Sequence, residues 1–206
     1  MPRWFRRFGD IPGVAYNADP RVDRSKLSRH DDVPKRQTYT SEGKQHESLS
    51  WPVRGGTTSA SPAQDHAPKD DSTASLLRYV SEVLELPGQA SDYHFAVQRV
   101  IEDLWKRRRE ERDVLPELER LCWLDIRLIE TAPEAISSEL SSADADGRPI
   151  FVRVLAFSHL VYLYEREGLL HEALDVAERA KRFEQGEDDC TRLQERIAQL
   201  RSYDAS

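Results

Sequence analysis

Apolar residues are scarce in this chain of 206 residues. Hydrophobic residues make up 38% and charged residues 33%, and the mean hydropathy is −0.69. This is too little apolar material to bury the whole length around one core. No apolar run approaches the roughly 18 residues that a membrane-spanning helix needs. None follows the arginines of the N-terminal MPRWFRRFGDIPG, as it would in a signal peptide. We therefore expect a cytoplasmic protein without a transmembrane segment.

Cysteine pairs and catalytic motifs are missing as well. Cys122 and Cys190 lie far apart and form no CxxC pair, which favours small buried residues in a reducing compartment. His159 and His171 fall in no HExxH motif, and neither GxxxxGK[ST] nor GxSxG occurs with a suitable context. We expect no catalytic residue, no metal and no cofactor. An enzyme with an unrecognised site is a further alternative, which a co-purifying metal or cofactor would support.

Charge and hydrophobicity both change near residue 73. Residues 1–72 hold 12 basic and 10 acidic residues, a net +2, whereas residues 73–206 hold 18 and 27, a net −9. The net charge of −7 argues against a nucleic-acid-binding protein, because phosphate affinity requires concentrated lysine and arginine. The run KRRREER at 106–112 is better explained as a solvated helix end in which glutamates pair with arginines.

Residues 1–72 are predicted to form a disordered basic and polar arm. They are rich in Ser, Thr, Gly and Pro, and lack the apolar residues that would offset an ordering cost of roughly 1 to 2 kcal/mol per residue. One short motif mixes aromatic and basic side chains, as docking or membrane-surface segments do. It consists of Arg3, Trp4, Phe5, Arg6, Arg7 and Phe8. The alternative is a terminus that dangles, or that folds back onto the acidic part of the chain.

Residues 73–206 are predicted to form an all-α domain of stacked antiparallel helical hairpins. Apolar residues recur there every three or four positions. The first helix has Ser72 or Thr73 as its cap and stops at Pro87 and Gly88. The last helix, at 188–203, carries a single apolar stripe and is polar elsewhere, which is typical of a capping helix.

The most regular pattern lies in LAFSHLVYLYEREGLLHEALDVAERA, residues 155–180. Apolar residues surround most of the first segment, so that helix must be covered on more than one side. Gly168 fits the left-handed residue that commonly ends a helix. Ala173, Ala177 and Ala180 lie on one side of the second segment and allow two helix backbones to approach closely. We therefore predict a tightly packed helical hairpin.

This combination resembles the tetratricopeptide repeat family over roughly residues 154–187, the length of one repeat. The residues that carry the resemblance are Phe157, Leu160, Val161, Tyr164, Gly168, Leu170, Ala173, Ala177 and Ala180. The chain departs from the family in having Gln185 where a proline usually closes the repeat, and in showing one clear copy. About three units are needed for stability, so the earlier helices would be degenerate repeats or would stack in the same way.

The resemblance implies an α-solenoid fragment that holds a peptide or helix of a protein partner in a groove lined by the first helix. The partner-binding residues implied by this analogy are Leu155, Ser158, His159, Tyr162, Glu165 and Arg166. The lysine and asparagine of the family's carboxylate clamp are absent here, which argues against a chaperone C-terminus as the ligand. The alternative interpretation is that Tyr162 is a core residue and that Glu165 and Arg166 are ordinary solvated charges.

We therefore predict a non-enzymatic adaptor that binds a protein partner. The alternative is a regulatory protein whose helical domain dimerises while its basic aromatic N-terminus contacts nucleic acid or a membrane surface. Salt dependence separates the two, because phosphate binding weakens steeply as salt rises. The sequence is compatible with a homo-oligomer and does not identify the partner or the biological process.

Overall fold

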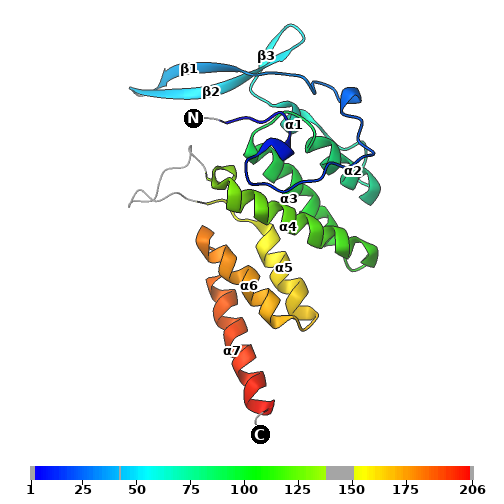
Figure 1. Ribbon diagram of the computed structural model, residues 1–206, viewed down its shortest axis with the longest axis vertical. Helices are drawn as coiled ribbons and strands as arrows, with labels where there is room; N and C mark the ends of the chain where they lie inside the picture. Colours follow the sequence, from blue (N-terminus) through cyan, green and yellow to red (C-terminus); the bar gives the residue numbers. More distant parts are fainter. Residues whose placement is uncertain (1–2, 42, 138–150, 205–206) are drawn as a thin grey trace. The chain divides into compact units, whose positions relative to one another are not determined.

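The computed structural model describes residues 3–41, 43–137 and 151–204 (Figure 1). These residues are mostly helical and include a small three-stranded sheet. The chain forms two compact units, one from residues 1–100 and 127–135, the other from residues 101–126 and 136–206. Helices α3 (Ala90–Arg107) and α4 (Leu115–Thr131) contribute residues to both. Within the described ranges, no helix is both long and apolar enough to cross a membrane.

The short helices of the first unit begin where the sequence supplies a capping hydroxyl. Helix α1 (Pro62–Asp65) follows Ser61, whose Oγ accepts the backbone N–H of Gln64. Helix α2 (Thr73–Val83) follows Ser72, whose Oγ accepts the N–H of Ser75. Each cap satisfies a backbone donor that has no partner inside the helix. The structure thus confirms Ser72 as the cap of the first helix in the predicted helical region.

The N-terminal residues fold against α2 and α3, so the prediction of a disordered arm is wrong. Phe5 and Gly88 exchange two backbone hydrogen bonds of 2.8 and 3.0 Å, and the N–H of Phe8 donates to the carbonyl of Leu84 at 2.9 Å. The side chains of Phe8 and Trp51 are fully buried. Burial of such large rings helps to offset the ordering entropy of the segments that carry them. Two short 3-10 helices, η1 (Phe8–Asp10) and η2 (Arg24–Lys26), lie in this part of the chain.

The sheet also departs from the predicted all-α class. Its strands are β1 (Lys35–Ser41), β2 (Lys44–Val53) and β3 (Gly56–Thr58), paired antiparallel in the order β1-β2-β3. Leu49 and Trp51 on β2 are buried, whereas all seven residues of β1 are exposed. Because β1 has no buried residue and the buried residues of β2 are confined to positions 49–51, the apolar alternation is too short to reveal the sheet in the sequence.

The second unit contains the predicted helical hairpin. Helix α5 (Leu155–Arg166) and helix α6 (Leu170–Ala180) pack against each other, and α6 also packs against α7 (Glu187–Asp204). The 3-10 helix η3 (Arg112–Val114) directly precedes α4, and η5 (Lys181–Phe183) directly follows α6. A further 3-10 helix, η4 (Pro133–Ala135), belongs to the first unit.

The glycine and the alanines that predicted the hairpin have the conformation and the burial expected of them. Gly168 separates the helices with φ of +81°, in the left-handed region. Ala173, Ala177 and Ala180 are all buried, which permits the close approach of the helix backbones. Helix α7 covers the predicted capping helix at 188–203. Stacking of further hairpins into a solenoid stays a prediction.

Candidate functional site

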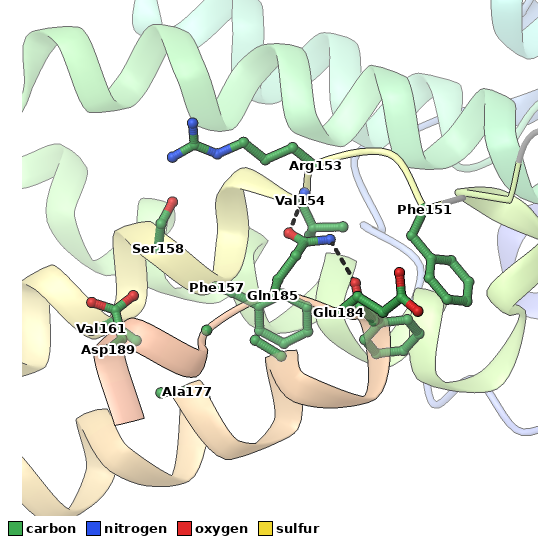
Figure 2. Close-up of a pocket in the computed structure, with 13 residues that line it drawn as sticks. Phe151, Arg153, Val154, Phe157, Ser158, Val161, Ala177, Glu184, Gln185 and Asp189 are labelled. Carbon is green, nitrogen blue, oxygen red and sulfur yellow. Dashed lines mark hydrogen bonds between the residues drawn. The ribbon is translucent and has the colours of Figure 1, made fainter. Parts of the chain in front are cut away.

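A pocket with a volume of about 410 Å³ lies beside α5 in the second unit (Figure 2). Its lining comes from the segment that enters α5, from α5 and α6 themselves, and from the connection between α6 and α7. The apolar lining includes Val154, Phe157, Val161, Ala177, Ala180 and Phe183, and the polar lining consists of Arg153, Ser158, Glu184, Gln185 and Asp189. A largely apolar hollow with a few polar groups is the usual form of a ligand site.

The hollow exists because small and large side chains face it from different helices. Ala177 and Ala180 on α6 leave space, whereas Phe157 on α5 stacks with Phe183 at a ring-centroid distance of 5.9 Å. The chain then turns sharply at Gly186, where φ is +84°. A Cβ atom at this position would lie 2.6 Å from the carbonyl oxygen of Ala177, so only glycine lets the connection pass so close to α6.

Gln185 holds one wall of the pocket in place. Its Oε1 accepts the backbone N–H of Val154 at 2.9 Å, and its Nε2 donates to the carbonyl of Val152 at 3.2 Å and to that of Phe183 at 3.4 Å. One amide therefore ties the segment that enters α5 to the segment that leaves α6. A side chain with both a donor and an acceptor thus fixes this junction by hydrogen bonds.

A cluster of three rings and one guanidinium contacts α5 through His159 and Tyr162, which lie outside the pocket lining. Trp105 of α3 and His159 of α5 stack, with ring centroids 3.9 Å apart and ring planes 3° from parallel. The ring of Tyr162 meets Trp105 edge-on at 5.2 Å. The Arg108 guanidinium carbon lies 3.5 Å from the centroid of the Trp105 ring, a cation–π contact. These four residues all belong to the second unit.

His159 is kept neutral at physiological pH by this packing. Its side chain is 9% exposed. Burial lowers the pKa of the imidazole from 6.5 to about 4, and the positive charges of Arg108 and Arg153 act in the same direction. Its Nε2 atom has no hydrogen-bond partner among the described residues. The imidazole therefore serves as a stacking partner for Trp105 rather than as a charged ligand group.

Glu165, at the end of α5, is held by two arginines of α7. Arg196 lies 2.7 Å from its carboxylate, and Arg192 pairs with the second oxygen. Partial burial raises the pKa of Glu165, but the hydrogen bonds from Arg192 and Arg196 outweigh it, so the pKa lies below its ordinary value. Glu165 therefore links α5 to α7 by ion pairs and is not an ordinary solvated charge.

All six predicted partner-binding residues lie on α5, and we call this set of residues the α5 face. It comprises Leu155, Ser158, His159, Tyr162, Glu165 and Arg166. Ser158 lines the pocket, and Tyr162, with 42% of its surface exposed, lies one helical turn further on. Arg166 is exposed and Leu155 half-buried. Tyr162 is therefore not a core residue, and it presents an aromatic ring to solvent beside the pocket.

The sequence did not point to Trp105, Arg108 or the bonding role of Gln185. Trp105 and Arg108 lie in the polar stretch at the end of α3, where no periodicity marks a packed residue. Gln185 stood out only as a departure from the family pattern. Trp105 meets His159 of another helix, and Gln185 bonds to Val154, 31 residues away, so neither contact leaves a local sequence signal. Arg108 contacts Trp105 three residues before it, but a cation next to an aromatic residue in a run of charges does not by itself indicate packing.

The basic aromatic motif at the N-terminus lies in the first unit. Trp4 packs edge-on against Trp51 at 5.8 Å, and Phe8 packs against Tyr93 at 5.6 Å. Its arginines, Arg3, Arg6 and Arg7, are exposed. The aromatic rings are thus used within the unit, and the alternative that this terminus folds back describes it better than a free docking motif.

The chain matches no protein-family model, no curated protein and no solved structure. Membership of the tetratricopeptide repeat family therefore stays a prediction. In the part of the chain that the structure describes, no group of three His, Cys, Asp or Glu side chains is placed to hold a metal ion.

Proposed function

We propose that this protein is a non-enzymatic adaptor that binds a peptide segment of a partner protein across the α5 face. The observation that supports this most directly is the pocket of about 410 Å³ next to Ser158. It lies on the helix that lines the binding groove in the family the sequence resembles. Its lining is mainly apolar, as expected of a site that receives a side chain of a ligand.

The pocket would take one apolar side chain of the peptide as an anchor. Full burial of a leucine, isoleucine or phenylalanine side chain contributes about 1.5 to 3 kcal/mol. Tyr162 is close enough to contact a neighbouring residue of the same peptide, because Ser158 and Tyr162 lie one turn apart, about 5 to 6 Å. An exposed tyrosine supplies contact area together with a hydroxyl for hydrogen bonding.

Charges on the α5 face define what else the peptide carries. His159 is neutral at pH 7, and Glu165 is already paired with Arg192 and Arg196. Arg153 is the exposed cation of the pocket lining, and Arg166 is exposed at the end of α5. The lining also holds two acidic residues, the exposed Glu184 and Asp189, which pairs with Arg192. A peptide whose acidic residue reaches Arg153 or Arg166, on the side of the anchor away from Glu184, therefore complements this surface best.

A peptide-display selection on the full chain tests the proposal. Selected peptides should share one large apolar residue with an acidic neighbour. Ser158→Trp places a ring in the pocket and should weaken their binding at least tenfold. Glu178→Trp is the matched control, because Glu178 is exposed on α6 and lies outside the pocket lining. Peptides that bind both variants equally, or a selection without enrichment, would refute the proposal.

The contact of the N-terminus with nucleic acid or a membrane is supported less well. Phe8 is buried, Trp4 packs on Trp51, Trp4 and Phe5 are half-buried, and the arginines of that motif are exposed.

A further inference from the structure

The second unit contains another hollow, which shares no lining residue with the pocket beside Ser158. Its volume is about 350 Å³, and it is more open to solvent than that pocket. It is lined by Trp123 of α4, Tyr164 of α5, and His171, Glu172 and Asp175 of α6. All five residues belong to the second unit, so one body carries the whole lining.

The aromatic wall of this hollow is held by a chain of hydrogen bonds. The indole Nε1 of Trp123 donates to the hydroxyl of Tyr164 at 2.9 Å, and this hydroxyl donates to the carboxylate of Glu119 on α4. Burial, and then the hydrogen bond to Glu119, raises the pKa of Tyr164 to about 12, so the hydroxyl stays protonated at physiological pH. Because the indole N–H and the phenol O–H are both donated within the wall, the two rings offer a ligand their π-electron faces.

The charges at the hollow are mainly negative. Glu172 and Asp175 line it, and Glu119 is bonded to its wall. Asp175 pairs with Arg179, one turn further along α6, at 3.0 Å. Glu172 is exposed, and in the described part of the chain no cation lies within ion-pair distance of it. The hollow therefore presents a carboxylate together with aromatic faces, a combination that favours organic cations.

Arg179 indicates which kind of cation fits. It lies outside the lining, and its guanidinium carbon is 5.4 Å from the centroid of the Trp123 ring, within the range of a cation–π contact. Its Nε donates to Asp175. A guanidinium stacks on rings and bonds to carboxylates in its own plane, whereas an ammonium is a compact and more strongly hydrated charge. The hollow is therefore better suited to arginine than to lysine.

We propose that this hollow binds the guanidinium group of an arginine side chain from a partner protein. The incoming group stacks on Trp123 and pairs with Glu172, and it competes with Arg179 for the ring and for Asp175. Exposed ion pairs and cation–π contacts are individually weak, so this contact adds specificity to a larger interface. It uses no residue of the pocket beside Ser158, and its failure would leave peptide binding at that pocket untouched.

NMR titration of the full ¹⁵N-labelled chain with a blocked arginine, N-acetyl-arginine methylamide, tests this site. The chain has four tryptophans, so Trp123→Phe is needed to assign the indole signal of Trp123. At low salt that signal should shift in a saturable way with blocked arginine, and should not shift with blocked citrulline, which has the same shape without the charge. Blocked lysine should bind at least about threefold more weakly. Absence of a saturable shift, or equal binding of citrulline or lysine, would overturn the proposal.

Surface variants on α6 separate this site from general charge attraction. Glu172→Gln should weaken the binding of blocked arginine at least about threefold. Glu178→Gln removes the same charge from an exposed position outside the lining and should leave the affinity unchanged. Arg179→Gln should tighten binding about threefold, because it releases Asp175 and removes the competing cation. Equal losses with Glu172→Gln and Glu178→Gln, or weaker binding with Arg179→Gln, would contradict the site.

Discussion

Acidification should destabilise the second unit through His159. The imidazole is stacked on Trp105 at 3.9 Å and 9% exposed, and its pKa is lowered from 6.5 to about 4 by burial and then by Arg108 and Arg153. The unfolded chain therefore binds this proton more tightly than the folded chain. The stabilising contribution is fully present above pH 6.5 and is lost as the pH falls from 6.5 toward 4.

The magnitude follows from the two pKa values. Each tenfold change in a proton-binding constant corresponds to about 1.4 kcal/mol, so a fall from 6.5 to 4 sets an upper limit of about 3 kcal/mol. The ring edge keeps some contact with solvent, and screening reduces the expected loss in the free energy of unfolding to about 2 kcal/mol between pH 7 and pH 4.

Two measurements check this expectation. Proton-detected NMR titration should give His159 a pKa well below 6, with His159→Phe used for assignment. Urea unfolding at pH 7 and pH 4.5 should show a smaller pH-dependent loss for His159→Phe, which keeps the stacking ring and removes the titrating group. A pKa of 6 or above for His159, or the same loss in both proteins, would refute the account of its burial.

Three further predictions concern packing and can be checked by chemical or thermal unfolding of the full chain. Ala173→Phe should overpack the contact between α5 and α6 and cost roughly 1 to 3 kcal/mol; an unchanged melting temperature would contradict the packed hairpin. Gly186→Ala should cost roughly 1 to 3 kcal/mol, because φ is +84° and the new Cβ would lie 2.6 Å from the Ala177 carbonyl oxygen; wild-type stability would show that the connection relaxes freely. Trp51→Ala should lower the free energy of unfolding of the first unit by about 3 to 5 kcal/mol, because Trp51 is fully buried. An unchanged free energy of unfolding would instead support a disordered N-terminal arm.

The sequence predicted the helices of the second unit because their contacts repeat at short range. The spacing of Ala173, Ala177 and Ala180 and the position of Gly168 follow helix geometry, and the structure agrees with both. Ser158 was predicted through the resemblance, and the structure places it at the pocket. These features depend on neighbours a few residues apart along one or two helices.

Features that depend on distant residues were not predictable in the same way. Trp51 is a single aromatic residue in a polar segment and Phe8 lies in a basic motif, and each becomes a core residue only through distant partners, Trp51 through Trp4 and Phe8 through Leu84 and Tyr93. Strand β1 has no buried residue from which alternation could arise. The stacking of Trp105 on His159 joins residues from different helices, and sequence periodicity within one helix carries no information on such a contact.

Site-specific photocrosslinking tests the binding role of the α5 face most directly. A benzoylphenylalanine residue at Tyr162 of the full chain should form an adduct with a partner in the native cell, and Ser158→Trp in the same chain should abolish that adduct. The same photoreactive residue at Glu178, exposed on α6, should form none. An adduct at Glu178 but not at Tyr162, or one at Tyr162 that persists with Ser158→Trp, would contradict peptide binding at the pocket.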